Sequence, residues 1–375
     1  MNNLSSYVEY LWNKTTHKER LLFFEKIVFF FLCCLEPMYK MGFFVVCFFK
    51  KKHGDKSTYP FKIISVGNLS IGGTGKSVVT QFLVRRLGSQ KIAIAMRGYK
   101  SKHNSEKNFL VHDEKHFLCN VVQSGDEAYM AAAMVHIPVV VGSDRYKSCK
   151  LLEQKIPDID IILFDDAYQN FSVKKDFQIL LLDARAPFEN HHWLPAGRLR
   201  EKDISRADVI ILTHANKVSE KQLDVIRRKD LYSFNQKRIF AGKHALVGVI
   251  QGVTGKNWRQ DVQGKKFLIT AGVGSWDGFL DTISDTKIIV VAEKRLENHH
   301  TYSKNDIREL LDSAQKNNAD GIMTTYKDWY KIEPYVALLG DKEKKYFYVL
   351  QIEFEFLLEH DYASFEKVLK DSLKR

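Results

Sequence analysis

The sequence predicts an α/β protein built on a doubly wound, mainly parallel sheet. Short runs of Val, Ile and Leu recur along the chain, helical segments separate several of them, and a glycine-rich turn joins one run to a helix. Continuous apolar runs are typical of strands that are buried on both faces of a parallel sheet. The predicted strands are 61–66, 91–96, 138–141, 159–164, 177–182 and 209–213, and the helices between them include 77–87 and 126–135.

A second, smaller α/β domain is predicted from about residue 240. No Pro/Gly linker marks the boundary, but strand-like runs recur at 266–271, 288–291, 321–323 and 346–352, with a helix at 304–316. The expected organisation is a membrane-association segment at 1–52, a core at 53–240 that holds the glycine-rich turn, and a C-terminal domain at 241–375 whose last helix can pack on the core.

The N-terminal segment predicts an amphipathic helix that contacts a membrane. Residues 27–35 and 41–49 are apolar throughout, and Glu36 and Pro37 lie between them. Spanning a bilayer takes roughly 20 consecutive apolar residues, so neither run suffices alone. The pattern favours a helix, or a helix broken at Pro37, in the membrane interface with the lysines at 50–52 among anionic headgroups. A core-packing helix and a single imperfect transmembrane span are the alternatives.

The charge balance indicates anionic partners. The formal net charge is +12, from 57 Lys and Arg against 45 Asp and Glu, which suits nucleotides, lipid headgroups or nucleic acid. The basic residues are dispersed and no recognised nucleic-acid module is present, so nucleic acid ranks last. The five cysteines show no paired spacing and indicate reduced thiols in a cytosolic compartment.

The glycine-rich turn predicts a phosphate-binding loop of the P-loop NTPase kind. It follows the 61–66 strand and precedes the 77–87 helix, so backbone N–H groups and the helix N-terminus can face phosphate oxygens. Ser70 stands where the GxxxxGK[ST] pattern has glycine, and the loop reads as the compact GGxGK[ST] variant. The predicted nucleotide-binding residues are Gly72, Gly73, Thr74, Gly75, Lys76 and Ser77.

The carboxylates that organise magnesium are predicted at the end of a neighbouring strand. The apolar run 161–164 ends in Asp165 and Asp166, which fits the Walker B role, and Ser77 would supply a hydroxyl ligand. ATP and Mg²⁺ are therefore the expected cofactors. GTP is disfavoured, because Ser219 stands where a guanine-specificity motif beginning at Asn216 needs Asp.

Several segments, in order along the chain, resemble the signature of the tetraacyldisaccharide 4′-kinases of Gram-negative lipid A synthesis. LPAGRLRE is the most specific of them. The matching segments are VGNLSIGGTGKS (66–77), RGY (97–99), GDEA (125–128), DR (144–145), DDAYQN (165–170), LPAGRLRE (194–201), NHHTY (298–302) and TTYKD (324–328).

The resemblance implies transfer of the ATP γ-phosphate to the 4′-hydroxyl of a tetraacylated disaccharide 1-phosphate. In that reading Asp126 accepts the hydroxyl proton and His299 orients it, while Lys76, Arg145 and Arg200 stabilise phosphoryl charge. Glu127 joins the magnesium set, and Gln169 and Glu201 are lesser candidates. The implied partners are the lipid substrate and the cytoplasmic face of the bacterial inner membrane, with no obligate protein partner evident.

Two segments depart from the family pattern, the residue before His299 and the run AYQN at 167–170, where the family has GFQH. Asn298 replaces the Asp that commonly precedes the histidine, and a neutral amide would perturb the pKa of His299 less. Asn170 stands where the family has a histidine after the aspartate pair, so any role of that histidine is in doubt.

A membrane-associated P-loop switch or targeting ATPase is the competing function. Such proteins share the compact loop and the amphipathic anchor, but need no acid–base pair for a sugar hydroxyl. LPAGRLRE and the Asp126/His299 pair favour the kinase.

Overall fold

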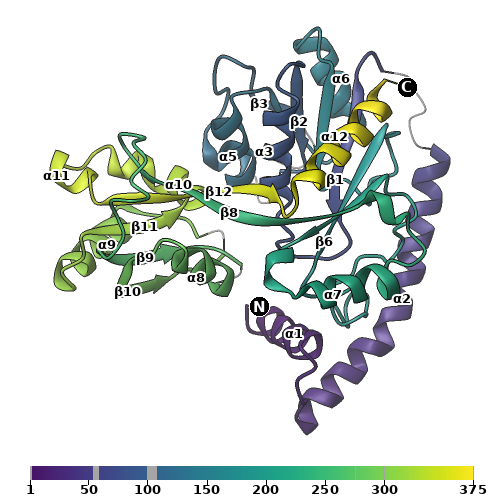
Figure 1. Cartoon of the computed structure of the whole chain (residues 1–375), viewed down its shortest axis with the longest axis horizontal. Coiled ribbons are helices and arrows are strands. Elements are labelled where there is room, and N and C mark those ends of the chain that lie inside the picture. The colour runs from purple at the N-terminus through teal and green to yellow at the C-terminus, as the bar shows by residue number, and fades with distance from the viewer. Residues whose placement is uncertain (1, 54–58, 99–107, 275, 299, 375) are drawn as a thin grey trace.

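The structure is a computed structural model and describes residues 2–53, 59–98, 108–274, 276–298 and 300–374. A long helix and a shorter one lie at one margin of an α/β body, and a smaller group of strands and helices projects from the opposite side (Figure 1). The elements are α1 (Asn2–Thr16), α2 (Phe23–His53), β1 (Lys62–Asn68), α3 (Lys76–Arg86), β2 (Ile92–Met96), β3 (Phe109–His112), α4 (Val121–Ser124), α5 (Asp126–Val135), β4 (Val139–Val141), α6 (Arg145–Lys155), β5 (Ile161–Asp165), β6 (Phe177–Asp183), β7 (Val209–Thr213), η1 (Ala215–Lys217), α7 (Glu220–Val225), η2 (Ile226–Asp230), η3 (Gln236–Arg238), β8 (Ile239–Gln251), β9 (Lys266–Ala271), α8 (Trp276–Ser284), β10 (Ile289–Arg295), α9 (Lys304–Lys316), β11 (Gly321–Thr325), α10 (Tyr326–Val336), α11 (Asp341–Lys344), β12 (Phe347–Phe356) and α12 (Glu359–Leu373).

The strands of the described chain join in one twelve-stranded sheet of order β10-β9-β11-β12-β8-β7-β6-β1-β5-β2-β4-β3. Neighbours run parallel except at β8–β12 and β3–β4. β1 lies between β5 and β6, so the chain leaves the centre of the sheet in both directions. Open α/β sheets bind ligands outside the carboxyl ends of their strands at such a switch point. The predicted α/β class with a large, mainly parallel sheet is confirmed.

Apolar side chains bury both faces of the central strands. On β1, Ile64 packs with α3, α5 and α12 on one face, and Ile63 packs with α6 on the other. This two-sided burial explains why the strands read as unbroken apolar runs. Phe365 and Leu369 of α12 belong to the same cluster as α3, so the last helix packs on the core.

Two long strands connect the main body to the projecting group (Figure 1). β8 pairs with β7 over its first residues and with β12 from Gly242 onward. The boundary expected at residue 240 therefore falls inside one continuous strand, and the division into two domains stays a prediction. β12 runs beyond the predicted residue 352, because Phe354 and Phe356 pack against Phe82 of α3.

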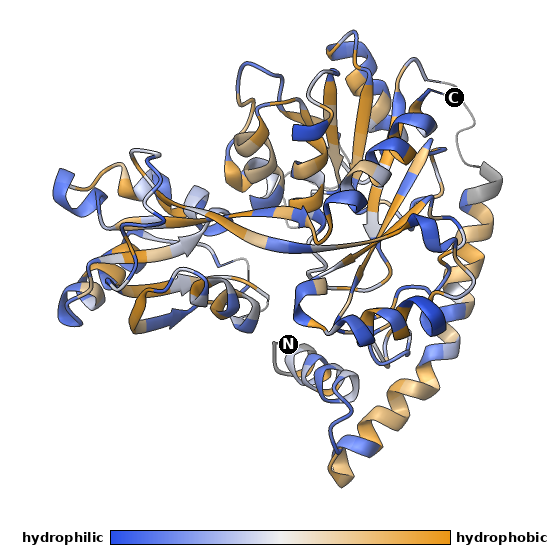
Figure 2. Ribbon diagram, viewed as in Figure 1, coloured by the Kyte–Doolittle hydropathy of each residue, from blue (hydrophilic) through white to orange (hydrophobic). Residues whose placement is uncertain are grey.

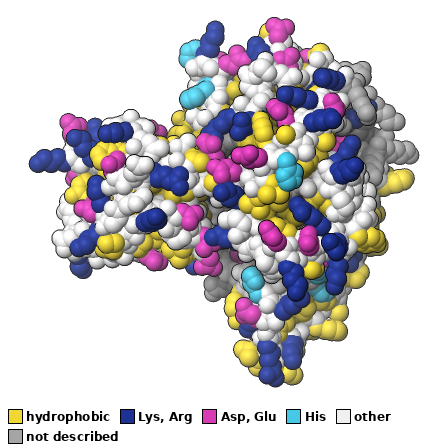
Figure 3. Space-filling model, in the orientation of Figure 1, with side chains coloured by type: hydrophobic (Ala, Val, Ile, Leu, Met, Phe, Trp, Pro, Cys, Tyr) yellow, Lys and Arg dark blue, Asp and Glu magenta, His cyan; other side chains and the backbone are white. Residues whose placement is uncertain are grey.

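α2 is one continuous helix that passes through Pro37, about 46 Å long at 1.5 Å per residue. Figure 2 shows apolar residues along most of it, and Figure 3 shows apolar side chains at the margin where α1 and α2 lie. Phe23–Lys50 is long and apolar enough to cross a membrane by length and composition, and little of it is buried. The two apolar runs thus combine in one helix, although neither would suffice alone.

Candidate active site

The loop between β1 and α3 leads into a helix N-terminus through a left-handed glycine. Gly75 has φ 81°, and its carbonyl accepts the first helical bond from the Val79 N–H over 3.1 Å. A side chain at this position would be strained and would collide with the His244 ring, which packs against the loop from β8. A glycine-rich turn that opens a helix presents backbone N–H groups and the positive dipole end to phosphate.

Lys76 and Arg200 share the same two acceptors beside this loop. Lys76 Nζ donates to Asn68 Oδ1 over 3.2 Å and lies 3.7 Å from Asp166 Oδ1. Arg200 Nη2 donates to Asn68 Oδ1 over 2.5 Å and to Asp166 Oδ1 over 2.9 Å. Burial opposes ionisation of Asp166, yet the Lys76 and Arg200 cations outweigh it and hold the pKa of this carboxyl at about 2. A phosphate at the loop would meet two cations of one network.

Asp165, the last residue of β5, is a buried carboxylate with an oxygen that lacks a partner. It is 5% exposed, and its Oδ1 has no hydrogen-bond partner. Burial raises the pKa of Asp165 to about 7, against the opposing charge of Lys76. Within the described ranges no three His, Cys, Asp or Glu side chains gather into a metal cage. The orphaned oxygen fits Mg²⁺, which typically takes one or two carboxylates together with substrate phosphates.

Arg145 is buried next to Asp165, and its guanidinium donates to backbone carbonyls. Its Nη1 donates to the Gly142 carbonyl over 3.1 Å and its Nη2 to the Asp165 carbonyl over 2.8 Å. The guanidinium also lies over the Phe164 ring, at 5.6 Å from the centroid. These contacts fix the strand end that carries Asp165. The expected contact of Arg145 with phosphate stays a prediction.

Asp126 begins α5 and faces lysines of α10. Its Oδ2 lies 2.9 Å from Lys331 Nζ and 3.7 Å from Lys327 Nζ. Lys327 also donates to Asn298 Oδ1 over 3.2 Å, and Lys331 to the His300 carbonyl over 3.3 Å. The lysines that hold Asp126 therefore also hold the residues on both sides of position 299. His299 itself lies outside the described residues.

Glu127, next to Asp126 on α5, acts electrostatically on both groups of charges. Its carboxylate contributes to the raised pKa of Asp165, although burial is the larger cause. The same carboxylate opposes the lowering of the Lys327 pKa, which burial causes. The start of α5 is thus within electrostatic reach of both the Walker B strand end and α10.

The LPAGRLRE segment lies along the phosphate loop. Leu199 forms a β-bridge with Ser70, and the Ile71 N–H donates to the Arg198 carbonyl over 2.8 Å. The Arg200 N–H donates to the Leu69 carbonyl over 2.7 Å. These bonds place the Arg200 side chain where it reaches Asp166.

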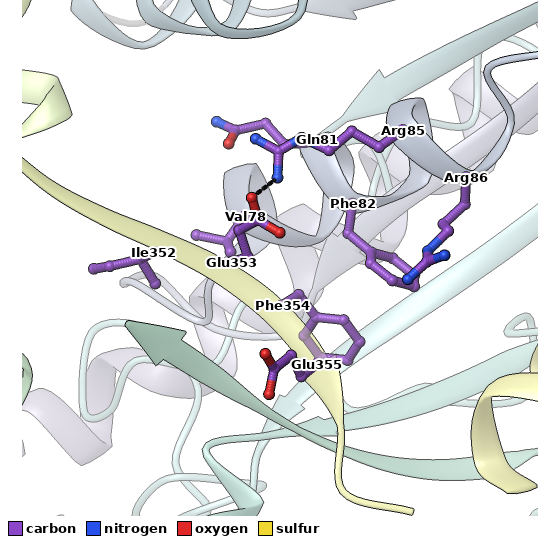
Figure 4. A pocket seen from close by; sticks show the side chains of 9 residues that line it. All are labelled: Val78, Gln81, Phe82, Arg85, Arg86, Ile352, Glu353, Phe354 and Glu355. Carbon is purple, nitrogen blue, oxygen red and sulfur yellow. Dashed lines mark ion pairs between the residues drawn. The ribbon is translucent and has the colours of Figure 1, made fainter. Parts of the chain in front are cut away.

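A cavity of about 210 Å³ lies between α3 and β12 (Figure 4). The Arg85–Glu353 ion pair crosses it and ties α3 to β12, the strand that returns from the C-terminal elements to the core. Its lining residues are Val78, Gln81, Phe82, Arg85, Arg86, Ile352, Glu353, Phe354 and Glu355. None of them is a predicted phosphate-site residue, although Val78 directly follows Ser77 of the loop.

The structure brings part of the predicted set into direct contact and adds residues to it. Lys76, Arg200 and Asp166 form one network, to which Asn68 supplies an unpredicted acceptor. Lys331 was also missed. Its spacing in the sequence could have identified it. It lies four residues after Lys327, the lysine of TTYKD, so the two lysines share one face of a helix.

A glycine-rich turn that opens a helix at the switch point of a parallel sheet, two cations beside it and a buried strand-end carboxylate with an unpartnered oxygen are the features expected of a P-loop phosphotransferase. The chain belongs to the tetraacyldisaccharide 4′-kinase family, because a model of that family, LpxK (tetraacyldisaccharide-1-P 4′-kinase), matches residues 29–374.

Similar proteins support this assignment. The tetraacyldisaccharide 4′-kinase of Elusimicrobium minutum is 30% identical over 352 residues, which cover 91% of each chain. That of Desulfatibacillum aliphaticivorans is 31% identical over 321 residues, which cover 84% of each chain. A crystal structure of LpxK from Aquifex aeolicus in complex with ATP matches with a TM-score of 0.67 and 22% identity, over 90% of this chain and 97% of that one. This last likeness supports the fold.

Proposed function

We propose that this chain transfers the γ-phosphate of ATP to the 4′-hydroxyl of a tetraacyldisaccharide 1-phosphate. The observation that carries the proposal is the shared network of Lys76 and Arg200 on Asn68 and Asp166, at the helix N-terminus of a chain of this family. The ATP complex of the Aquifex aeolicus relative supports ATP as the donor.

The phosphate loop binds and orients the nucleotide. Backbone N–H groups of the Gly72–Gly75 turn hold the phosphate chain, and Lys76 swings from Asn68 to the β- and γ-phosphate oxygens. The Arg200 guanidinium, fixed at its backbone by Leu69, neutralises the charge that spreads over the transferring group. Catalysis of phosphoryl transfer rests largely on this positioning and charge neutralisation.

Asp165, with Ser77 and Asp166, would hold Mg²⁺ and Glu127 would complete the set. When bound, the ion neutralises charge on the β- and γ-phosphates. Asp165 supplies the orphaned oxygen for this role, and Arg145 fixes its backbone. Arg200 already engages Asp166, so Asp165 is the principal carboxylate of the proposed site.

Asp126 acts as the general base. It takes the proton of the 4′-hydroxyl as that oxygen forms a bond to the γ-phosphorus, and the bond from the γ-phosphorus to the bridging oxygen breaks to release ADP. Lys331, whose ammonium lies 2.9 Å from Asp126 Oδ2, orients the Asp126 carboxylate. His299 is proposed as the partner of Asp126 on the family resemblance.

α2 attaches the enzyme to the cytoplasmic face of the inner membrane as an interfacial helix. One side of it contacts the body from Phe29, against His192, to Tyr39 and Phe43 on the core. The other side exposes large apolar residues such as Phe30, which is 64% exposed. A helix with one side on the protein and one apolar side free suits half-immersion better than a span surrounded by lipid.

The proposal is tested by incubating the protein with radiolabelled Mg-ATP and detergent-dispersed tetraacyldisaccharide 1-phosphate. We expect label in the lipid with the wild type, and a loss of about 100-fold or more with Lys76→Ala. ATP hydrolysis without labelled lipid would instead indicate the switch ATPase.

A further inference from the structure

Glu36 is a buried carboxylate on α2, a helix that is mostly exposed and apolar. It is 7% exposed, whereas Phe31 and Leu35 on the same helix are 62% and 48% exposed. It accepts hydrogen bonds from the Trp193 backbone N–H over 3.1 Å and from His192 Nδ1 over 2.8 Å. Lys40 Nζ completes the cluster at 2.6 Å. A carboxylate leaves water only where such partners satisfy it, and membrane contact alone does not require one.

Aromatic rings of α2 enclose the residue that Glu36 holds. The Trp193 ring lies 5.5 Å from Phe43, 6.0 Å from Phe44 and 6.4 Å from Tyr39, measured between centroids. The ring is thus packed on α2 while its backbone N–H is bonded to the same helix. Trp193 therefore has little freedom to move apart from α2.

Trp193 begins the segment that lies along the phosphate loop. It bridges to Leu199, and the Leu194 N–H donates to the Leu199 carbonyl over 2.9 Å, which closes a compact turn. Leu199 in turn bridges to Ser70. The Tyr39 hydroxyl of α2 donates to the carbonyl of Arg200 over 3.4 Å. A continuous set of contacts thus runs from α2 to the backbone of Arg200.

We propose that Glu36 is a positioning residue for phosphoryl transfer: it holds Trp193, and thereby fixes the 192–200 turn and the Arg200 guanidinium on Asp166 and Asn68. α2 is then part of the catalytic scaffold as well as a membrane contact. The proposal rests on the proposed kinase function, since it assigns Glu36 an effect on the phosphate site of that reaction.

Glu25 offers a matched control on the same helix. It is also buried, at 4% exposed, and it accepts from Lys14 Nζ over 3.0 Å, the Tyr10 hydroxyl over 3.1 Å and the Leu22 N–H over 2.6 Å. Tyr10 and Lys14 lie on α1 and Leu22 lies just before α2, so none of these partners belongs to the 192–200 turn. α1 reaches that turn through Trp12, whose indole N–H donates to the Pro195 carbonyl over 2.9 Å. Glu36→Leu and Glu25→Leu each remove one buried carboxylate and make the helix more apolar by the same amount.

The kinetic test measures lipid phosphorylation in detergent micelles and binding to anionic phospholipid vesicles. We expect Glu36→Leu to lower kcat about tenfold, because a displaced Arg200 guanidinium neutralises the transferring group less well, while vesicle binding is unchanged or tighter. Glu25→Leu stays within about twofold of the wild type in kcat. Glu36→Gln recovers much of the rate, because its amide oxygen can still accept from Trp193. Equal kcat for the two Leu variants overturns the proposal.

A double-mutant cycle separates positioning from general destabilisation. If Glu36 acts through Arg200, the Glu36→Leu/Arg200→Ala double variant turns over no more slowly than Arg200→Ala alone. Additive losses would mean that Glu36 acts elsewhere, and the proposal would fail.

Amide hydrogen exchange measures the coupling between Glu36 and the 192–200 turn without an activity assay. Exchange at Ile71 and Arg200, whose N–H groups join the turn to the phosphate loop, should speed up in Glu36→Leu and not in Glu25→Leu. Unchanged protection at both amides overturns the inference whether or not the chain is a kinase. A wild type that labels no lipid removes the proposed function instead.

Discussion

The ammonium group of Lys331 lies 2.9 Å from the Asp126 carboxylate, so an ion pair joins α10 to the first turn of α5. Beside it, Tyr129 of α5 packs edge-on to Tyr330 of α10, with 6.1 Å between ring centroids. The proposed general base is thus held by the C-terminal part of the chain, although it is covalently part of the body that carries the phosphate loop.

Lys331→Met should lower kcat about tenfold while the KM for ATP changes less than about twofold. The variant removes the close ion pair of the proposed base, and breaking a buried ion pair by removing one partner costs about 3 kcal/mol, while the nucleotide contacts are untouched. Steady-state kinetics with lipid and ATP varied in turn measure it. Lys316→Met, on an exposed part of α9, is the control. Unchanged kcat in Lys331→Met would mean that the ion pair does not serve the base.

Asp126→Asn should lower kcat by about 100-fold or more, since a general base contributes 10²–10⁴-fold. ATP affinity should stay within about threefold, because an amide of the same shape is neutral and cannot take the proton. Equilibrium binding of a non-hydrolysable ATP analogue and single-turnover transfer measure the two quantities. Near-normal turnover would remove Asp126 from the base role.

Asp165→Asn should stabilise the metal-free fold at pH 8 while it impairs magnesium-dependent turnover. Burial raises the pKa of Asp165 from 3.8 to about 7. The folded state binds the Asp165 proton more tightly than the unfolded state does. This binding adds to the free energy of unfolding below about pH 4, and the contribution is lost as the pH rises through about 7. The Asp165→Asn variant has no ionisable group at this position, so its free energy of unfolding at pH 8 should be higher by up to a few kcal/mol.

Denaturant unfolding at pH 5 and pH 8 checks the Asp165 prediction. The exposed Asp158→Asn serves as the control and should show no pH-dependent gain. The same gain in both variants would show that the effect does not come from the buried carboxyl.

Arg145→Lys should mainly lower stability, whereas Arg200→Lys should mainly lower kcat. Arg145 donates to two backbone carbonyls in the interior, so its replacement should cost about 3 kcal/mol of stability and lower Tm. Arg200 is partly exposed and donates two parallel bonds to Asp166, so its replacement should lower kcat with little change in Tm. Calorimetry and single-turnover rates on both variants measure the split, and the reverse pattern would contradict these assignments.

Phe30→Asp combined with Phe31→Asp should weaken vesicle binding by about 100-fold or more, since each exposed ring would bury apolar area in the acyl layer. Lipid phosphorylation in detergent should persist. Tyr232, an exposed aromatic residue on the body, gives the control Tyr232→Asp. Full vesicle binding by the double variant would place the membrane contact elsewhere.

The sequence predicted those strands, helices and turns that depend on residues close together in the chain. The apolar runs marked β1, β5 and β6 because these strands are buried on both faces. The helix predicted at 304–316 matches α9, whose Ser303 and Asp306 form a capping box. The glycine-rich turn marked the phosphate loop because Gly75 must be left-handed.

Contacts between distant segments were not predictable in the same way. Periodicity cannot pair Lys331 with Asp126 or Glu36 with Trp193, since these pairs depend on how whole elements pack. The length of β12 was underestimated because Glu353 and Glu355 interrupt its apolar pattern, while Arg85 and Lys243 satisfy those carboxylates in the fold.

The most direct test of the kinase assignment is ³¹P NMR of the lipid recovered after incubation with Mg-ATP. We expect a second phosphomonoester signal coupled to the 4′ position, formed by the wild type and absent with Asp126→Asn and Lys76→Ala. A lipid that keeps its single phosphate while ATP is consumed would contradict the account.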